Sequence, residues 1–341
     1  MNNKIWKYHN MSKINILVVG GAGYIGSHMC KYLSKNNYQP IVLDSLVYGH
    51  AQAVKWGPLI KGSVQNTDLL KKIFAEYNIA VVMHFAAFTY VGESVENPGK
   101  YYNNNVAATI SLLDEMVNSN ISNFIFSSSC AAYGNPVEIP ITENHPQNPI
   151  NPYGRTKLMV EQILDDYENA YGMKSVSLRY FNAAGADPDK ELGEDHQPET
   201  HLIPLVLQTA LGQKENIHIF GNNYPTTDGT CIRDYIHIND LAQAHLLALE
   251  RLLNNLPGGK YNLGNGNGYS VKEVIETACQ ITGRNIPLQI TDRRAGDTAI
   301  LIGSSKKAVK ELGWKPKYPD LNTIIETAWA WHKNHPGGYT K

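Results

Sequence analysis

The sequence carries almost no surplus of charge. Its 341 residues include 30 lysines and arginines against 31 aspartates and glutamates, which gives a formal net charge of −1 at pH 7. Such a chain sets up no broad positive field, so we expect neither nucleic acid nor a membrane surface as its partner. A local cationic site for a phosphate-bearing small molecule is still compatible with this balance.

Cysteine is scarce, and the four cysteines Cys30, Cys130, Cys231 and Cys279 stand far apart along the chain. Their spacing matches neither a disulfide framework nor a set of metal ligands. We therefore predict that the protein has no metal site and that it is cytoplasmic, where its thiols stay reduced.

The N-terminal region lacks a long apolar run. Its first apolar run, Ile14–Val19, is too short for the core of a secretory signal or for a membrane span. Secretion is therefore not expected. Because Met11 comes just before this run, we interpret residues 1–12 as an N-terminal extension, of which residues 1–10 either belong to the protein or precede an alternative start.

Short β-branched runs alternate with helical patterns in the first half of the chain. Strands are predicted at residues 14–20, 41–44, 80–85, 123–127 and 175–180, and helices at residues 25–35 and 153–171. This alternation indicates an α/β fold with a Rossmann-like, doubly wound parallel sheet. We assign this domain to residues 13–180.

From residue 181 onward the pattern changes. Residues 182–199 are rich in glycine, aspartate and proline, which predicts a loop that covers a ligand. Further helices are predicted at residues 203–211, 239–253, 271–281 and 321–333. We interpret residues 181–341 as a smaller α/β domain that mainly binds the substrate, with part of the chain able to cross back to the first domain.

A glycine-rich turn follows the first predicted strand and reads Gly20-Gly21-Ala22-Gly23-Tyr24-Ile25-Gly26. Without side chains, Gly20 and Gly23 let the backbone approach a pyrophosphate at the N-terminus of the next helix, and Gly26 allows that helix to pack close to the strand. A glycine-rich turn of no function is the alternative. The order of strand, turn and helix favours a dinucleotide site.

An acidic residue, Asp44, ends the second predicted strand. This is the position from which a carboxylate accepts hydrogen bonds from the ribose hydroxyls of a dinucleotide. The carboxylate would repel the 2′-phosphate of NADP, so we expect NAD as the cofactor. A carboxylate that only caps its loop is the alternative.

A second constellation joins Tyr153, Lys157 and Ser129. Tyr153 and Lys157 stand one helical turn apart, and Ser129 follows the predicted strand that precedes their helix. Lys157 and a cationic nicotinamide would favour the Tyr153 phenolate, while Ser129 would hydrogen-bond the reacting oxygen and relay its proton. Taken singly, Ser129 reads as a strand-end cap and Tyr153 as an ordinary helical residue. Together, next to a dinucleotide turn, they indicate a hydride-transfer site.

These motifs resemble the extended short-chain dehydrogenase/reductase family, and within it the UDP-glucose (galactose) 4-epimerases. The resemblance covers nearly the whole chain and is carried by residues 20–28, 84–94 (HFAAFTYVGES), 101–106, 123–134, 152–163, 179–185, 229–240 and 293–297. It implies an NAD-binding domain, a sugar-nucleotide domain, and a homodimer paired through helices near residues 109–118 and 158–171.

The resemblance also implies a reaction. Tyr153 would take the O4 proton while a hydride leaves C4 of the sugar for tightly bound NAD. The 4-keto sugar would turn over, and the hydride would return to its other face. UDP-galactose and UDP-glucose would be interconverted without net redox change.

Site residues carry over from the family position by position. The catalytic residues would be Ser129, Tyr153 and Lys157. The cofactor contacts would be Gly20, Gly23, Tyr24, Ile25, Gly26, Asp44, Ser63, Val64, Phe85, Ala86, Asn104, Lys157 and Tyr180. The UDP-sugar contacts, which include two arginines suited to phosphate, would be Ser129, Tyr153, Asn182, His201, Leu202, Phe220, Arg233, Arg294, Asp297 and Leu301.

Some positions depart from relatives. Sugar-nucleotide dehydratases have a catalytic Asp–Glu pair where this chain has Cys130 and Ala131, so dehydration is disfavoured. Ser63 stands where relatives usually have an aspartate that binds the adenine, which would weaken the hold on the cofactor. His201 stands where some epimerases have an asparagine against the nucleotide.

The sugar pocket differs at Leu301, which falls where some relatives have a bulky tyrosine. Loss of the ring would free volume for an N-acetyl group, so we expect that UDP-GlcNAc and UDP-GalNAc are also substrates. A UDP-pentose or UDP-uronate 4-epimerase is the alternative enzyme. A non-catalytic NAD-sensing regulator is the alternative of a different class.

Overall fold

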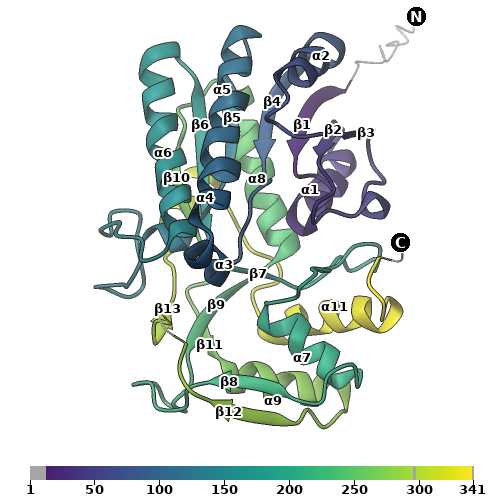
Figure 1. Ribbon diagram of the computed structural model, residues 1–341, viewed down its shortest axis with the longest axis vertical. Helices are drawn as coiled ribbons and strands as arrows, with labels where there is room; N and C mark the ends of the chain where they lie inside the picture. The colour runs from purple at the N-terminus through teal and green to yellow at the C-terminus, as the bar shows by residue number, and fades with distance from the viewer. Residues whose placement is uncertain (1–12, 295–296, 340–341) are drawn as a thin grey trace, which may run out of the picture.

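The computed structural model describes residues 13–294 and 297–339, so the interpretation of residues 1–12 as an extension lies outside the described residues (Figure 1). The helices are α1 (Tyr24–Lys35), α2 (Thr67–Tyr77), α3 (Val91–Glu96), α4 (Pro98–Tyr101), α5 (Ala108–Asn118), α6 (Pro152–Tyr171), α7 (Leu202–Ala210), α8 (Ile238–Leu253), α9 (Val271–Thr282), α10 (Lys306–Leu312) and α11 (Leu321–Asn334). The strands are β1 (Ile14–Val19), β2 (Tyr38–Asp44), β3 (Leu59–Lys61), β4 (Ile79–His84), β5 (Asn123–Ser129), β6 (Lys174–Tyr180), β7 (Asn182–Ala184), β8 (Ile217–Phe220), β9 (Ile232–His237), β10 (Gly259–Leu263), β11 (Gly268–Ser270), β12 (Leu288–Thr291) and β13 (Ile300–Leu301).

Seven parallel strands form the central sheet in the order β10-β6-β5-β4-β1-β2-β3. The chain enters at β1, builds outward to β3 on one side, and then returns to β4 on the other side of β1. The connections that leave β1 and β4 therefore run in opposite directions. Doubly wound sheets bind their ligands at this kind of switch point, beyond the carboxyl ends of the strands. The predicted Rossmann-like α/β fold is confirmed.

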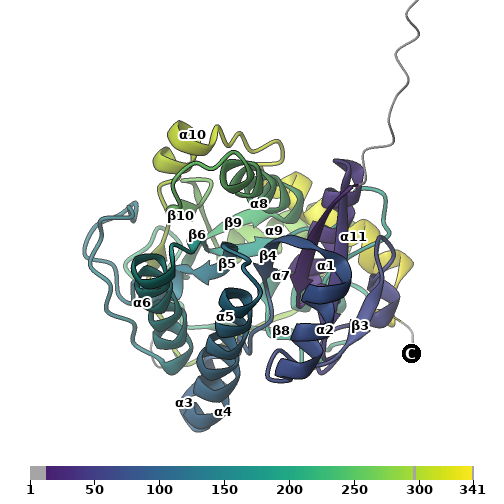
Figure 2. The same cartoon turned by 90° about the horizontal axis from the view of Figure 1, so that it is seen from above.

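Alternating side chains of β1 build two cores, one on each face of the sheet. Ile16 and Val18 belong to a buried cluster that includes residues of α1 and α8. Leu17 and Val19 belong to a second cluster with residues of α2, α5 and α6. Successive residues of a strand point to opposite faces, and a parallel sheet covered on both sides therefore requires a continuous apolar run. Figure 2 shows α8 on one face of the sheet and α5 and α6 on the other.

The smaller part of the molecule is built around β9. This strand pairs with β11, β13 and β7, while β8 and β12 form a separate two-stranded sheet. Helices α7, α9 and α11 share a buried cluster that includes Val206, Val274 and Ile324. In Figure 1 these three helices lie together below the central sheet.

The chain crosses between the two parts after residue 237. Helix α8 packs on α1, and β10 pairs with β6 at the edge of the central sheet. The proposed domain division at residue 180 thus assigns two elements to the second domain by sequence although they pack on the sheet of the first. None of the described helices combines the length and the apolar character that crossing a membrane requires.

The loop predicted over residues 182–199 is wrong at its start. Residues Asn182–Ala184 form β7 and pair in parallel with β9. The Asn182 side chain also donates to the Asp234 carbonyl oxygen at 2.9 Å. Pairing with a strand some 50 residues away is not visible in the composition of the segment, which is why the loop composition misled the prediction.

Candidate active site

The glycine-rich turn lies at the switch point of the sheet. The Gly20 amide donates to the Leu43 carbonyl at the end of β2 (2.8 Å), and the Phe85 amide donates to the Val19 carbonyl at the end of β1 (2.8 Å). The turn therefore joins the carboxyl ends of β1, β2 and β4. Gly20 has φ +81°, and a Cβ there would lie 2.5 Å from the Ala86 nitrogen.

The first turn of α1 fits a phosphate. The helix begins after Gly23, which has no side chain to cap it and whose Cβ would meet only the Gly20 oxygen, at 3.4 Å. A Cβ on Gly26 would lie 2.2 Å from the same oxygen, so helix and turn approach closely. An uncapped helix N-terminus reached through glycines is a ready anion site, and this backbone fits the pyrophosphate of a dinucleotide.

Replacing Gly20 by alanine is expected to lower the free energy of unfolding by roughly 1–3 kcal/mol, because a side chain there meets backbone and must adopt a left-handed conformation. Gly172→Ala is the matched control, since Gly172 also has positive φ (+70°) but its Cβ would meet nothing within 4 Å. Urea unfolding of both variants measures the difference. Equal losses would contradict the close approach at Gly20.

The hydroxyl of Tyr24, the first residue of α1, points away from the glycine-rich turn. The hydroxyl donates to the Gly185 carbonyl oxygen at 2.6 Å, and the ring packs edge-on against His28 and His196. Burial raises the pKa of Tyr24 well above its usual value. A contact of Tyr24 or Ile25 with a cofactor phosphate would therefore come from the backbone N–H groups at the helix start.

Asp44 caps its own loop. Its carboxylate accepts the Ala22 amide at 2.9 Å and the Leu46 amide at 2.8 Å. Burial raises the pKa of Asp44, and these hydrogen bonds oppose the rise. The capping interpretation is thus correct, and it leaves further lone pairs on both oxygens for ribose hydroxyls.

The other expected cofactor contacts lie at nearby strand ends or in the following segments. Phe85 packs its ring 4.9 Å from that of His245, with Ala86 next to it. Ser63 accepts the Gln65 amide at 3.2 Å. Asn104 lies in a π-helical turn and donates to Asn105. The remaining two, Val64 and Tyr180, are buried.

Helix α6 presents Tyr153 and Lys157 at the carboxyl end of β5. Asn151 caps the helix by accepting the Gly154 amide at 2.8 Å, and Pro152 begins it, as suits a first turn. Tyr153 lies near enough to Ser129, the last residue of β5, for the serine hydroxyl to oppose the rise in the tyrosine pKa. Ser129 also accepts the Ala131 amide at 3.1 Å, so its capping role is real as well.

Lys157 is buried beside Tyr153. Its Nζ donates to the Ser127 carbonyl at 2.8 Å and lies 5.8 Å from the centre of the Tyr153 ring. Burial lowers the pKa of Lys157 to about 7, against the attraction of Glu161. Burial raises the pKa of Tyr153 to about 12, while the Ser129 hydroxyl opposes the rise. The chain alone therefore favours the neutral phenol, and a further positive charge is needed to stabilise the phenolate.

A buried ion pair, which the sequence analysis did not predict, fixes α6 to the strands next to this site. Arg179 on β6 and Glu161 on α6 have side chains 2% and 0% exposed, and Arg179 Nε donates to Glu161 Oε1 at 2.8 Å. Ser128 donates to the same oxygen at 2.5 Å, and Tyr133 accepts from Arg179 at 2.7 Å. The network joins α6 to the ends of β5 and β6.

Two arginines gather at the far side of β9. Arg294 lies 3.0 Å from Asp297 and stacks 4.4 Å from the centre of the Phe220 ring. Arg233 lies 3.7 Å from Asp297 and donates to the Thr298 carbonyl at 2.8 Å. The geometry suits an anionic ligand that would meet two guanidinium groups.

Leu301 links these arginines to the catalytic strand end. It lies in β13 in register with Arg233 of β9 and packs against a cluster that includes Cys130 and Phe181. Burial raises the pKa of Cys130 to about 12, and the charge of Arg233 opposes the rise. Cys130 is thus a neutral packed thiol directly after Ser129.

His201 does not lie free at the start of α7, where Leu202 follows it. Its Nδ1 is 2.5 Å from Glu194 Oε1, and the attraction raises the pKa of His201 although burial lowers it. The structure thus gathers the expected residues into three groups, around the turn, Tyr153 and Arg233, and engages His201 in a separate network.

Comparison with known proteins gives consistent matches. Residues 16–264 match the model of the NAD dependent epimerase/dehydratase family. The chain is 54% identical over 325 residues to a UDP-glucose 4-epimerase of Halalkalibacterium halodurans, which covers 95% of this chain and 97% of that protein. A UDP-glucose 4-epimerase from Brucella ovis, solved in complex with NAD, superposes with a TM-score of 0.91 at 50% identity and covers 93% of this chain and 98% of its own. A UDP-Glc/GlcNAc 4-epimerase from Campylobacter jejuni superposes with a TM-score of 0.82 at 40% identity. The match covers 94% of this chain and 99% of that protein.

Proposed function

Because the chain belongs to the NAD-dependent epimerase/dehydratase family, we propose that it is a UDP-glucose 4-epimerase, an NAD-dependent isomerase that interconverts UDP-galactose and UDP-glucose. The observation that carries the proposal is the buried Lys157, whose Nζ lies 5.8 Å from the centre of the Tyr153 ring and donates to Ser127 near the carboxyl end of β5, where Ser129 is the last residue. The 54% sequence identity to a curated UDP-glucose 4-epimerase supports UDP-glucose and UDP-galactose as the substrates.

In this reaction the chain handles one proton. Tyr153 takes the proton of the sugar O4 hydroxyl, and the neighbouring Ser129, whose hydroxyl opposes the rise in the Tyr153 pKa, relays it. NAD, held by the Gly20–Gly26 backbone and Asp44, would supply the redox chemistry at C4. After the 4-keto sugar has turned over, Tyr153 returns the proton to O4, so that sugar and protein end with the atoms they began with.

The remaining roles follow from charge and position. The Gly20–Gly26 backbone and Asp44 would hold the pyrophosphate and ribose of NAD, with Phe85 and Ala86 next to the turn. Arg233 and Arg294 would hold the phosphates of the UDP-sugar. Cys130 and Ala131 offer no carboxylate near Ser129, which opposes a dehydratase.

The test is NMR of the purified protein with UDP-galactose, without added NAD. Appearance of the anomeric signal of UDP-glucose is expected. If no conversion occurs even after NAD is supplied, the proposal fails and UDP-pentoses and UDP-uronates are tried next. Stoichiometric NAD binding without turnover of any UDP-sugar would instead indicate a non-catalytic regulator.

We also propose that UDP-GlcNAc and UDP-GalNAc are substrates, because Leu301, which packs against the cluster that contains Cys130, is smaller than the tyrosine of some relatives. Leu301→Tyr is expected to lower kcat/KM for UDP-GalNAc by roughly 10–200-fold while UDP-galactose is little affected. Leu301→Met, which keeps the volume, is the control. Equal loss for both sugars would contradict a specificity role of Leu301.

A cytoplasmic homodimer completes the proposal. Helices α5 and α6 lie side by side on one face of the sheet, and Met159 of α6 is 40% exposed. Two such helices from each subunit can pair about a two-fold axis. Light scattering after size exclusion measures the mass directly, and a monomer at micromolar concentration would contradict the dimer.

A further inference from the structure

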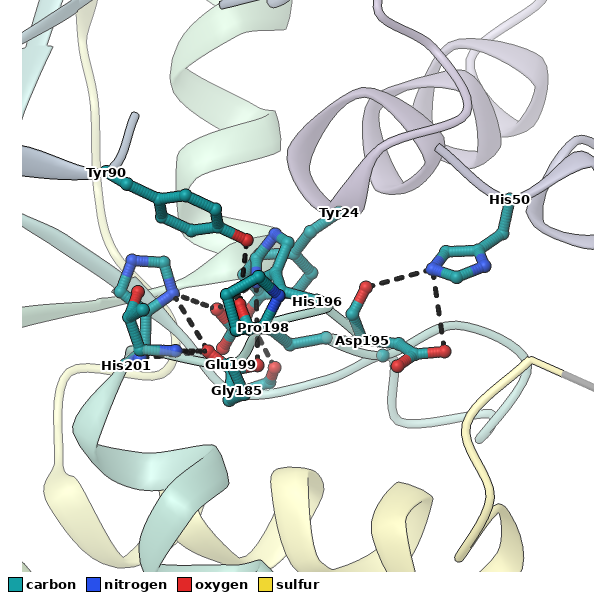
Figure 3. A network of polar contacts seen from close by, with 12 residues as sticks. Tyr24, His50, Tyr90, Gly185, Asp195, His196, Pro198, Glu199 and His201 are labelled. Carbon is teal, nitrogen blue, oxygen red and sulfur yellow. Dashed lines mark hydrogen bonds and ion pairs between the residues drawn. The ribbon is translucent and has the colours of Figure 1, made fainter. Parts of the chain in front are cut away.

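The eight residues that directly precede α7 include four side chains of types that can serve as metal ligands. The segment from Glu194 to His201 has the pattern Glu-x-His-x-x-Glu-x-His, with Glu194, His196, Glu199 and His201. In the structure one donor atom of each lies within 4.8 Å of the others. Figure 3 shows His196, Glu199 and His201 of this group gathered between the start of α1 and the start of α7.

The distances between donors suit a small cation. A tetrahedral ion bound at about 2.1 Å holds its ligands roughly 3.4 Å apart. His196 Nδ1 lies 3.3 Å from Glu194 Oε1 and 3.5 Å from Glu199 Oε2, and His201 Nδ1 lies 3.6 Å from Glu199 Oε1. His201 Nδ1 also lies 2.5 Å from Glu194 Oε1, and this hydrogen bond would have to open around an ion. Glu199 makes its two contacts through different oxygens, so one of the two would be the ligand.

Two buried atoms of this group, a nitrogen and a carboxylate oxygen, make no hydrogen bond. His196 Nδ1 and Glu199 Oε2 have no hydrogen-bond partner among the described residues, although each is shielded from solvent. The Glu199 side chain is 4% exposed, and its other oxygen is oriented by the Thr200 and His201 amides at 2.7 and 2.9 Å. In the chain alone the charge that meets Glu199 is the His196 imidazole, 3.5 Å away, whose pKa Glu194 and Glu199 raise to about 10 although burial lowers it. A carboxylate oxygen buried without a hydrogen bond is costly, and a metal ion would meet it more closely.

A neighbouring acidic group already holds a lysine ammonium at its centre. Asp187, Asp189 and Glu191 also lie together, but Lys31 places its ammonium 2.6, 2.8 and 2.6 Å from them. The chain supplies the cation there. That group therefore needs no metal and serves as a control.

We propose that Glu194, His196, Glu199 and His201 form a site for one divalent transition-metal ion of the zinc class. Imidazole together with carboxylate suits zinc and its neighbours better than calcium or magnesium. On binding, two protons leave to solvent, the one that His201 shares with Glu194 and the one that the charged His196 imidazole carries. A cavity of about 240 Å³, lined in part by Glu194, His196 and His332, gives the ion access.

The ion would fasten the segment between cofactor and substrate. Tyr24 at the start of α1 packs edge-on against His196 and hydrogen-bonds Gly185, while His201 precedes α7. A metal would tie the two helix starts through one loop. His201 would then be a metal ligand rather than a direct contact of the nucleotide. The site stands independently of the epimerase reaction.

The test uses the full-length holoenzyme without a histidine tag, treated with a chelator and then titrated with Zn(II) against a chromophoric indicator. One ion per chain is expected, and Co(II) should give the visible spectrum of a tetrahedral site. Glu199→Gln and His196→Gln should each weaken binding by at least about 10–100-fold, the loss that even outer partners cause. Asp189→Asn, in the Lys31 group, should leave binding unchanged.

Two results would overturn the site. One is wild-type protein that takes up no stoichiometric Zn(II), which leaves the cluster a network of ion pairs only. The other is binding that persists unchanged in Glu199→Gln, which puts the ion elsewhere. Thermal unfolding checks that the variants fold. If His196→Gln does not fold, Glu199→Gln alone decides the test.

Discussion

Tyr153→Phe is expected to lower kcat for UDP-galactose by about 10²–10⁴-fold, the contribution typical of a positioned general base. Only the hydroxyl is lost, so KM should change little. Without the phenol, the proton of the sugar O4 has no acceptor next to Ser129 and Lys157. Coupled assay of UDP-glucose formation measures the loss.

The pH dependence separates this role from a structural one. Burial raises the pKa of Tyr153 to about 12 in the chain alone, so the acceptor is scarce at low pH. Wild-type kcat should therefore rise with pH, whereas the residual rate of Tyr153→Phe should lose that rise. Tyr171→Phe, on the same helix and 59% exposed, is the control with full activity expected. A Tyr153→Phe variant that keeps more than a tenth of kcat would mean another group takes the proton.

Glu161→Gln is expected to lower the free energy of unfolding by about 3–5 kcal/mol. The change leaves the Arg179 guanidinium buried without its counter-charge, and burying an uncompensated charge is costly. Ser128 also loses its carboxylate acceptor. Urea denaturation followed by circular dichroism measures the change.

The matched control is Asp165→Asn on the same helix. Asp165 pairs with Lys260 at 2.6 Å, but its side chain is 53% exposed, so water screens the pair and less than about 1 kcal/mol should be lost. Similar losses in both variants would show that burial does not set the value of the Arg179 pair. Because Ser128 precedes Ser129, a smaller kcat is also expected in Glu161→Gln.

The elements near the cofactor turn could be predicted because their signals are local. A continuous apolar run gave β1, glycines at fixed spacing gave the turn, and a helix beginning after Asn151 gave the facing pair Tyr153 and Lys157. Strand ends shifted by only a few residues. For example, β2 begins at Tyr38 rather than residue 41 and includes Pro40, which pairs with Ile16.

What sequence reasoning missed depends on distant partners. The Arg179–Glu161 pair is buried only because β6 and α6 pack together, and a charged residue in a sequence reads as exposed until its partner is known. His201 was expected to face the nucleotide, and its pairing with Glu194 was not foreseen. A local signal exists there, since Glu194, His196, Glu199 and His201 occur within eight residues, whereas cysteine spacing carries no such signal in this chain.

The position of β10 at the edge of the central sheet has a consequence for the protein during its synthesis. Strand β6 can pair with β10, its neighbour at the edge of the sheet, only after about 80 further residues have left the ribosome. At 5–20 residues per second this takes roughly 4–16 s. During that interval β6 is an open edge to which an unrelated strand can add. The nascent chain is therefore most exposed to misassembly after its cofactor-binding strands exist and before the last of them is covered.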